Sequence, residues 1–466
     1  LAMEMRRLGL AKKPMIVVQK ATLTGFAAEF RQAYPGAKII VASDKRFEAK
    51  FRKRMLAQIA MGDWDAVIVT QPQFQRMLPG KDTIVAYFRQ QMDALNDAIQ
   101  AESAAAGKDS PSVRQLENAK KRLQTKLTEI LNSLIKNADK NISFDELGVD
   151  ALLVDEAHEF KNAPIVTRKK NVKGIPTGAA NRAMFAAMVM GTVQRRTGGG
   201  NVFLATGTPV VNSMAEAYVM LQMASPKVLE DYGITNFDGW ANTFGTTATD
   251  VEFTYSQKWK AVTRFRKFIN GPELLKMIRS SFDVKMGNKE LGLKVPSIKG
   301  GAPQFVVIPQ TPTQEKITNW IVSAADQFEA MDPKSRRENS WVPIVTMQMG
   351  MAAALDPRLI DPNAPDEPGS KANRAIENVV KIWHETEKDK GTQLVFLDRF
   401  KPMNTDKIRS FAGGAPTDIE IEISDEDLDG AAVTDEAATP EEDDAAAAAS
   451  AERDAYKSGG FNLYQD

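Results

Sequence analysis

Short apolar runs alternate with amphipathic segments along the first part of the chain, and this alternation predicts the fold. Two of the intervening segments, Ala21 to Tyr34 and Phe47 to Met61, carry apolar residues at helical spacing. Alternating strands and helices are typical of a parallel sheet with right-handed crossovers and helices on its faces. We therefore expect an α/β domain. The four runs predicted to be buried strands are Met15 to Val18, Lys38 to Ala42, Ala66 to Val69 and Ala151 to Val154.

The polar stretch from Thr83 to Asn137 departs from this alternation. It contains two helical runs separated by Gly107, Ser110 and Pro111, and the second run carries a narrow stripe of leucines. We expect an antiparallel helical hairpin inserted before the strand at Ala151. Its basic face is expected to be solvated, with contact to nucleic acid as the alternative. The leucines are Leu116, Leu123, Leu127, Leu131 and Leu134, and the basic residues are Lys120, Lys121, Arg122 and Lys126.

The second half of the chain is expected to hold further helices and two strands. The strands are predicted at Gln304 to Ile308 and Gln393 to Asp398. Before them lies an accessory segment, predicted to be helical, in which aromatic residues interleave with cations, as in Phe237 to Trp240 and Arg264 to Asn270. Core aromatics beneath surface charge are the simpler interpretation of that pattern. The helices are predicted at residues 178–195, 215–223, 272–281, 312–331, 341–354 and 373–388.

Two adjacent carboxylates, Asp155 and Glu156, follow the apolar run that ends at Val154. In open α/β sheets, ligands bind at the carboxyl ends of the strands. Paired acids at that position suit a nucleotide site. One acid can hold Mg²⁺, usually through water, and the other can orient and deprotonate an attacking water.

A resemblance to a known family rests on two motifs. Asp155-Glu156-Ala157-His158, extended by Lys161-Asn162, resembles the DEAH box of Swi/Snf-like ATPases of helicase superfamily 2. The segment from Phe203 to Ser213 is similar to motif III of that superfamily, which links ATP hydrolysis to movement on nucleic acid. The resemblance implies a RecA-like domain that binds ATP and Mg²⁺. It implies that Asp155 holds the ion through water, Glu156 activates water, and His158 couples the site to Thr206, Gly207 and Thr208.

The same resemblance suggests which residues contact DNA. Lys20 and Thr22 follow the first predicted strand, and Thr70 and Gln71 follow the third, where the superfamily places polar groups along a nucleic-acid backbone. Solvated loop residues are the alternative interpretation of Lys20 and Gln71. A basic loop after the DEAH box is a further candidate contact, and it contains Arg168, Lys169 and Lys170.

The phosphate-binding loop of such ATPases is missing, because no Gly-x-x-x-x-Gly-Lys-[Ser/Thr] occurs in the 466 residues. Nor does the sequence contain the arginine-bearing motifs V and VI. We therefore expect the chain to be a fragment that begins shortly after the loop. The alternative function is a non-enzymatic DNA-binding or assembly module whose ATPase site is incomplete.

Several further stretches resemble large phage and plasmid proteins that join an adenine-type DNA methyltransferase to a Swi/Snf-like helicase. They lie around Trp64, at Phe237 to Trp240, at Leu355 to Arg358 and at Gln393 to Asp398, and the likeness extends over about residues 1–410 and again over 461–466. Whether a methyltransferase is attached is left open. The predicted division is a first RecA-like domain over 1–225 with the insertion at 83–137, an accessory helical segment over 226–300, the start of a second RecA-like domain over 301–412, an acidic disordered insertion over 413–460, and a return to the second domain over 461–466.

A zinc protease is a competing interpretation of the DEAH segment. His158-Glu159-Phe160-Lys161-Asn162 begins like the zinc-binding helix His-Glu-x-x-His, but Asn162 stands where the second histidine would be. The chain contains two histidines and no cysteine, so further ligands would have to be carboxylates. The nucleotide site is therefore the preferred hypothesis.

The distribution of charge favours a nucleic-acid partner. The formal net charge is zero, but the segment from Asp418 to Asp444 holds thirteen acidic residues and no Lys or Arg, so the remainder has thirteen more basic than acidic residues. A basic folded part suits a protein that binds the phosphate backbone of DNA. The sequence contains no cysteine and no apolar run of membrane-spanning length. We expect a bacterial cytoplasm or phage-infected host cell as its location.

Overall fold

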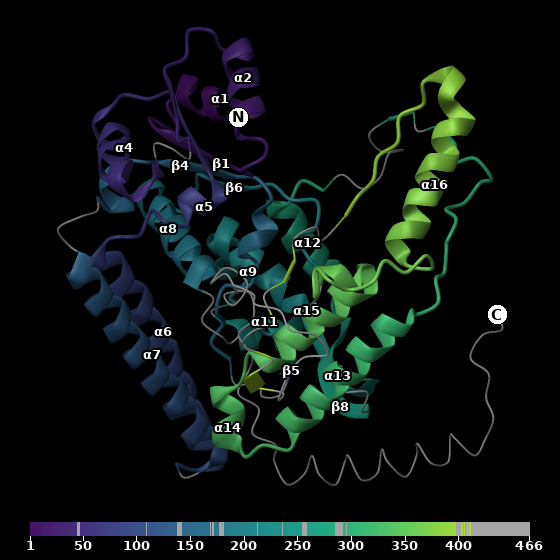
Figure 1. The fold of residues 1–466 in the computed structure, drawn as a ribbon. Coiled ribbons are helices and arrows are strands. Elements are labelled where there is room, and N and C mark those ends of the chain that lie inside the picture. The colour runs from purple at the N-terminus through teal and green to yellow at the C-terminus, as the bar shows by residue number, and fades with distance from the viewer. Residues whose placement is uncertain are drawn as a thin grey trace. The chain divides into compact units, whose positions relative to one another are not determined.

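A five-stranded parallel sheet organises the first part of the chain, in the strand order β2-β3-β1-β4-β6 (Figure 1). The computed structural model describes residues 1–411 except 44–46, 109, 138–141, 168, 170–171, 177–180, 212, 235, 254–258, 285–291, 295, 398–401, 404, 406–407 and 409. The strands confirm the α/β prediction. They are β1 (Pro14–Val18), β2 (Ile39–Val41), β3 (Ala66–Thr70), β4 (Ala151–Val154) and β6 (Val202–Leu204).

Both faces of this sheet are buried, and successive residues of each strand serve opposite faces. In β1, Met15 and Val17 join the larger core, whereas Ile16 and Val18 join a smaller core on the other side. The smaller core is covered by α1 (Ala2–Arg7) and α2 (Leu23–Ala33). The larger core is covered by α4 (Ala49–Met61), α8 (Asn181–Thr197) and α9 (Met214–Ala224).

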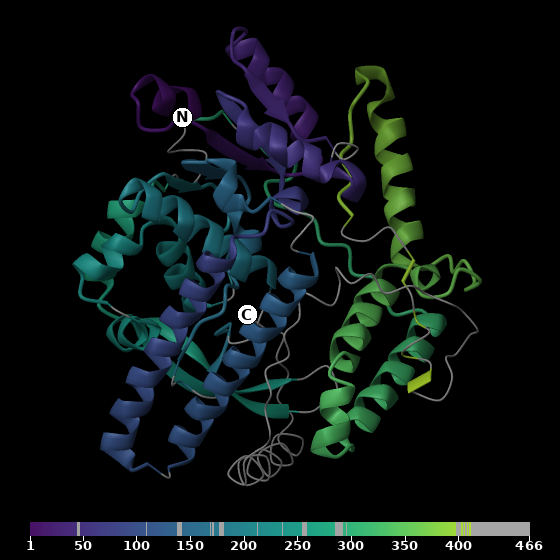
Figure 2. The ribbon, with the colours of Figure 1, turned by 90° about the vertical axis from the view of Figure 1, so that its left-hand side faces the viewer.

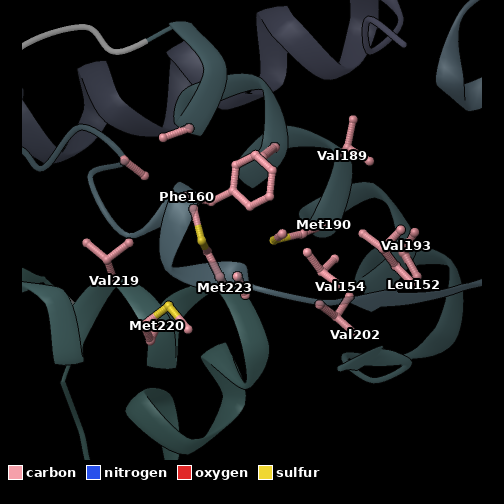
Figure 3. Packing of buried hydrophobic residues seen from close by; sticks show 14 of the residues in the cluster. Leu152, Val154, Phe160, Val189, Met190, Val193, Val202, Val219, Met220 and Met223 are labelled. Atoms are coloured by element: carbon pink, nitrogen blue, oxygen red, sulfur yellow. The ribbon is translucent and has the colours of Figure 1, made fainter. Parts of the chain in front are cut away.

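Figure 3 shows part of the larger core, where side chains of the strands meet those of the helices. Leu152 of β4 lies near Val193 of α8, Val154 of β4 lies near Met190, and Phe160 packs in the same cluster. Phe160 also makes an edge-on contact with Phe74, at 5.9 Å between ring centroids. The segment after β4 is thus anchored in the core, which fixes where the residues of the DEAH box lie.

The predicted helical hairpin is confirmed as α6 (Lys81–Ala106) and α7 (Pro111–Asn137), two long antiparallel helices seen side by side in Figures 1 and 2. Near its base, Ile84 and Phe88 pack on Met184 and Met188 of α8. Leu116 is buried, and Leu123 and Leu127 are partly buried in the hairpin. The leucine stripe therefore holds the two helices together, as the spacing predicts.

The accessory segment is only partly helical, so the prediction of a helical accessory segment is wrong in this respect. It contains α10 (Pro226–Asp231), α11 (Phe237–Phe244) and α12 (Gly271–Ser281), but between them run β7 (Gly245–Phe253) and β8 (Trp259–Phe268). Together with β5 (Val172–Lys173) these strands form a second sheet, in the order β5-β8-β7. The threonines, valines and aromatics of these runs favour extended backbone. Phe237 and Trp240 are buried in the larger core, which confirms the simpler interpretation for that stretch, whereas in the second stretch Phe265 is partly buried and Phe268 is exposed.

The chain divides into two compact units. The first comprises residues 1–248 and 263–284, and the second comprises 249–262 and 285–466. The accessory helices thus belong to the first unit. The remaining elements of the first unit are α5 (Gln71–Phe74), η1 (Phe144–Leu147) and η2 (Ala157–Phe160). The second unit contains α13 (Pro312–Glu329), α14 (Pro333–Glu338), α15 (Val342–Leu355), η3 (Pro357–Leu359), α16 (Lys371–Thr386) and η4 (Glu387–Asp389).

The strands predicted at 304–308 and 393–398 are not formed in the described part of the second unit. Residues 304–310 and 391–397 have no sheet partner there, and Asp398 lies outside the described residues. Phe305, Val307 and Phe396 are each about nine-tenths exposed. A strand exists only through hydrogen bonds to a neighbour, so apolar content alone does not make one. These residues therefore do not form the expected start of a second RecA-like sheet. The predicted acidic insertion at 413–460 and the return to the second domain at 461–466 lie outside the described residues.

Candidate active site

The carboxyl ends of four parallel strands lie at one edge of the main sheet, and they carry most of the predicted site residues. The register pairs Val18 with Thr70, Val17 with Val154, and Val154 with Leu204. The residues that follow each strand are therefore brought to the same edge. This is the edge at which open α/β sheets bind ligands.

Asp155 is held at the end of β4 by the neighbouring strand. Its backbone N–H donates to the carbonyl of Val17 at 2.8 Å, so the sheet fixes its position. Its carboxylate accepts from the backbone N–H of Glu156 at 3.0 Å and is half-buried. A rigidly placed carboxylate of this kind can face a hydrated cation.

Glu156 has a left-handed backbone, with φ of 49° and ψ of 47°. Glycine adopts this conformation readily, but residues with a Cβ, asparagine and aspartate apart, rarely do, because Cβ crowds the following carbonyl. Gln71 holds this backbone conformation in place, because its side-chain N–H group donates to the carbonyl of Asp155 at 2.9 Å and to that of Glu156 at 3.3 Å. Strained backbone that the surrounding structure maintains is frequent at functional sites.

His158 connects the acid pair to the loop after β6. Its Nδ1 atom lies 3.0 Å from Oε2 of Glu156 and 3.1 Å from Oγ1 of Thr206. An ionised carboxylate can only accept a hydrogen bond, so we assign the proton to Nδ1. The imidazole thus bridges the two sequence motifs, as predicted from their order in the chain.

The loop that follows β6 is built by its own side chains. The Thr206 hydroxyl accepts from the backbone N–H of Thr208 at 3.1 Å, and Ser213 caps α9 by accepting from Ala215 at 3.2 Å. Gly207 and Thr208 are exposed, and a side chain at Gly207 would meet no atom within 4 Å. The tip of this loop is therefore open to solvent.

The predicted nucleic-acid contacts fare differently from one another. Lys20 is exposed after β1, whereas Thr70 is buried, so its hydroxyl lies out of reach of a ligand at the surface. The side-chain N–H group of Gln71 donates to the backbone carbonyls of Asp155 and Glu156. Thr22 turns its hydroxyl to the carbonyl of Gln19 at 3.1 Å, at the start of α2. Lys169 donates to the side chain of Asn242 at 2.7 Å. Arg168 and Lys170 lie outside the described residues.

Sequence reasoning missed an ion pair behind the site. Nζ of Lys161, just after η2, lies 3.3 Å from Oε1 of Glu216 in α9, and both side chains are buried. A sequence signal existed, because Glu216 is the one acid in the apolar helix of residues 214–224. An acid in an otherwise apolar helix needs a buried partner.

A divalent ion at this edge would have one or two carboxylates available. Among the residues that the structure describes, no group of three His, Asp or Glu is placed to hold a metal. Magnesium commonly binds to proteins through one or two carboxylates and completes its shell with water and phosphate oxygens. Asp155, with Glu156 beside it, is compatible with that mode.

A cavity of about 400 Å³ lies elsewhere in the first unit and contains none of the predicted site residues. It is bounded by α6, by residues 164–167 and by Tyr218 and Asp238. Burial, together with the charge of Asp238, raises the pKa of Tyr218 to about 12. The phenol of Tyr218 is therefore neutral near neutral pH.

The fold and the edge residues define a helicase-like α/β protein. The chain belongs to a family described as a probable helicase domain, whose family model matches residues 1–286. It is also 32% identical over 207 residues to the Defense against restriction protein B of Escherichia phage P1. That match covers 44% of this chain and 9% of the phage protein. Of the helices that the structure describes, none has the length and apolar character needed to cross a membrane.

Proposed function

We propose that these residues are the central part of an ATP-dependent DNA motor of superfamily 2, with the DEAH box as its hydrolytic centre. The carrying observation is the contact of His158 with both Glu156 and Thr206, which joins the acid pair to the loop after β6. The helicase family and the phage relative support the proposal. Duplex DNA is the proposed partner, in phage or plasmid DNA modification, defence or replication, within the bacterial cytoplasm. The proposal includes a methyltransferase domain in the same natural polypeptide as a partner of the motor.

The three DEAH side chains would divide the work. Mg²⁺, when bound, neutralises charge on the phosphates of ATP. Asp155 would hold the ion through water, and Glu156 would orient and deprotonate the attacking water. His158, which contacts Thr206, would transmit the state of the site to the loop that carries Gly207 and Thr208.

The experiment compares three variants of the natural polypeptide that contains these 466 residues. Glu156→Gln keeps size and hydrogen bonding but removes the base, so turnover should fall by about 100-fold or more while ATP binding persists. Asp155→Asn should also weaken Mg²⁺-dependent ATP binding. His158→Ala should retain part of the basal hydrolysis and lose its stimulation by duplex DNA. Near-parental turnover in Glu156→Gln would show that Glu156 is not the base and would overturn the proposal.

A second candidate function is a DNA-binding or assembly module without hydrolysis. It is favoured by one observation, the lack of a Gly-x-x-x-x-Gly-Lys-[Ser/Thr] sequence in the 466 residues. Calorimetric titration of this chain with MgATP and with duplex DNA separates the two functions. DNA binding without any nucleotide binding, in the natural polypeptide as well as in this chain, would favour the module.

A further inference from the structure

The ion pair between Lys161 and Glu216 lies behind the DEAH box and is nearly closed to solvent. Their side chains are 10% and 3% exposed, and Nζ lies 3.3 Å from Oε1. A charge at such burial is costly unless it is paired and hydrogen-bonded. Each residue therefore depends on the other. Lys161, with its ammonium group turned inward, is also unavailable as a ligand for an external phosphate.

The carboxylate of Glu216 holds two segments at once. Its Oε2 atom accepts a hydrogen bond from the backbone N–H of Val211 at 2.7 Å. Val211 lies in the loop between β6 and α9, the loop that also carries Thr206. Glu216 thus ties this loop to α9 through one oxygen, and ties Lys161 to α9 through the other.

On the other side, Lys161 is joined to the DEAH box. Its backbone N–H donates to the carbonyl of His158 at 3.3 Å, at the end of η2. A closed ring of contacts results, from His158 through Lys161 and Glu216 to Val211, along the loop to Thr206, and back to His158 through the 3.1 Å contact at Nδ1.

We propose that Lys161 and Glu216 are a positioning pair, which sets the loop of residues 205–211 against the DEAH box so that His158 stays within hydrogen-bonding distance of Thr206. The geometric claim concerns this chain alone. Its consequence for DNA-stimulated hydrolysis rests on the proposed function. A buried ion pair often adds little net stability compared with apolar residues of similar volume. The pair contributes geometry here, because a carboxylate can accept from the Val211 N–H and pair with Lys161 at the same time, whereas an apolar side chain can do neither.

The test uses the imidazole signals of the full chain in nuclear magnetic resonance. The chain contains two histidines, so His384→Asn assigns the signals of His158. Lys161→Met should shift the His158 Nδ1 signal, because it breaks the link between the two segments at the ion pair. Glu216→Met should make the Val211 amide exchange roughly tenfold faster, because that N–H loses its hydrogen-bond acceptor. The double variant Lys161→Met/Glu216→Met should recover much of the thermal midpoint, yet leave the His158 signal displaced and the Val211 amide exchanging fast.

The matched control is Lys13→Met. Lys13 is a half-buried lysine at the opposite end of the strands. Its replacement by methionine should lower the thermal midpoint without moving the His158 signal. A parental His158 signal in the double variant would overturn the inference, and so would an equal displacement in Lys13→Met. None of these measurements uses ATP. If the unmutated natural polypeptide shows no DNA-stimulated turnover, the proposed function is overturned and the positioning pair is left intact.

Discussion

At the scale of the residue, Glu156 combines a chemical and a conformational peculiarity. Its left-handed backbone is maintained by the two hydrogen bonds from Gln71 and by the short helix η2 that starts after it. This conformation turns the chain sharply at the end of β4 and directs the carboxylate toward His158. A residue without Cβ would adopt it more easily, so the glutamate is kept here at a cost in stability.

We predict that Glu156→Gly is more stable than Glu156→Ala by about 1 kcal/mol, because alanine retains the Cβ clash of the left-handed conformation. Both variants lose the carboxylate and its contact with His158, so their difference isolates the backbone. Chemical denaturation of the two variants provides the measurement. Equal midpoints would mean that the backbone at this position relaxes out of the left-handed region.

At the scale of the element, Lys13 joins three ends of secondary structure. Its Nζ atom donates to the carbonyls of Ile59 and Ala60 in the last turn of α4, each at 2.9 Å, and to that of Leu147 in η1 at 3.2 Å. These carbonyls lack partners within their own helices. Burial lowers the pKa of Lys13, opposed by the charges of Asp63 and Asp150.

Replacing Lys13 with methionine should lower the free energy of unfolding by about 1–3 kcal/mol, since carbonyls at the ends of α4 and η1 lose a charged donor. Lys12→Met is the matched control, because Lys12 is exposed and only its backbone N–H is used, by Asp150. Urea denaturation of both variants tests this. A cost in Lys12→Met as large as in Lys13→Met would contradict the capping role.

A second element-scale device lies in the other unit, at the end of α15. Asp356 accepts from the backbone N–H of Arg358 at 2.8 Å and from its guanidinium. The guanidinium of Arg358 is the main reason that the pKa of Asp356 is lower than its usual value of 3.8. The folded state therefore favours the ionised form. Its stabilising contribution is present above the usual pKa and is lost as the pH falls through the lowered value.

We predict that Asp356→Asn removes part of the acid sensitivity of the second unit. Between about pH 5 and pH 3, the thermal midpoint of the parent should fall more steeply than that of Asp356→Asn, because only the parent takes up a proton there on unfolding. Thermal scans over this range are the measurement, and Asp366→Asn, at an exposed partner of Arg358, is the control. Parallel pH profiles of parent and Asp356→Asn would contradict the role of the pair.

At the scale of the whole molecule, the charge is unevenly spread along the chain. The acidic segment from Asp418 to Asp444 balances an excess of thirteen basic residues in the remainder. Binding to duplex DNA should therefore be weak, independent of sequence and steeply dependent on salt. We expect the acidic residues to compete with DNA phosphate for the basic surface when they are present in the same chain.

Deleting Asp418 to Asp444 should tighten binding to duplex DNA at low salt, and the gain should shrink as salt screens the charges. Fluorescence anisotropy over a series of salt concentrations measures both effects. A variant in which the thirteen acids become Asn or Gln, with the length kept, separates charge from chain length. Equal affinities of parent and deletion at low salt would contradict the competition.

Local pattern was sufficient for much of this fold. The strand at Ala151 to Val154, the hairpin and the acids at a strand end follow from residue spacing alone, because burial on both faces demands an apolar run and helix pairing demands a stripe. The order of the two motifs also predicted that the imidazole of His158 faces the loop of Thr206, and its Nδ1 atom lies 3.1 Å from Oγ1 of Thr206.

Other features depend on partners that are remote in sequence. The run from Gln304 to Ile308 resembles a strand in composition, but such a run becomes a strand only when a neighbour supplies hydrogen bonds. Thr70 was predicted to follow a strand as an accessible polar residue, but it is the last residue of β3 and packing buries it. The left-handed Glu156 and the hold of Gln71 on its carbonyl join residues 85 positions apart. The sequence by itself determined the strands of the main sheet, the helical hairpin and the residue types that follow the strands, because these depend on side-chain type and period. Tertiary structure alone decided which of those side chains are buried, paired or open at the edge of the sheet, because burial and pairing are properties of neighbours in space.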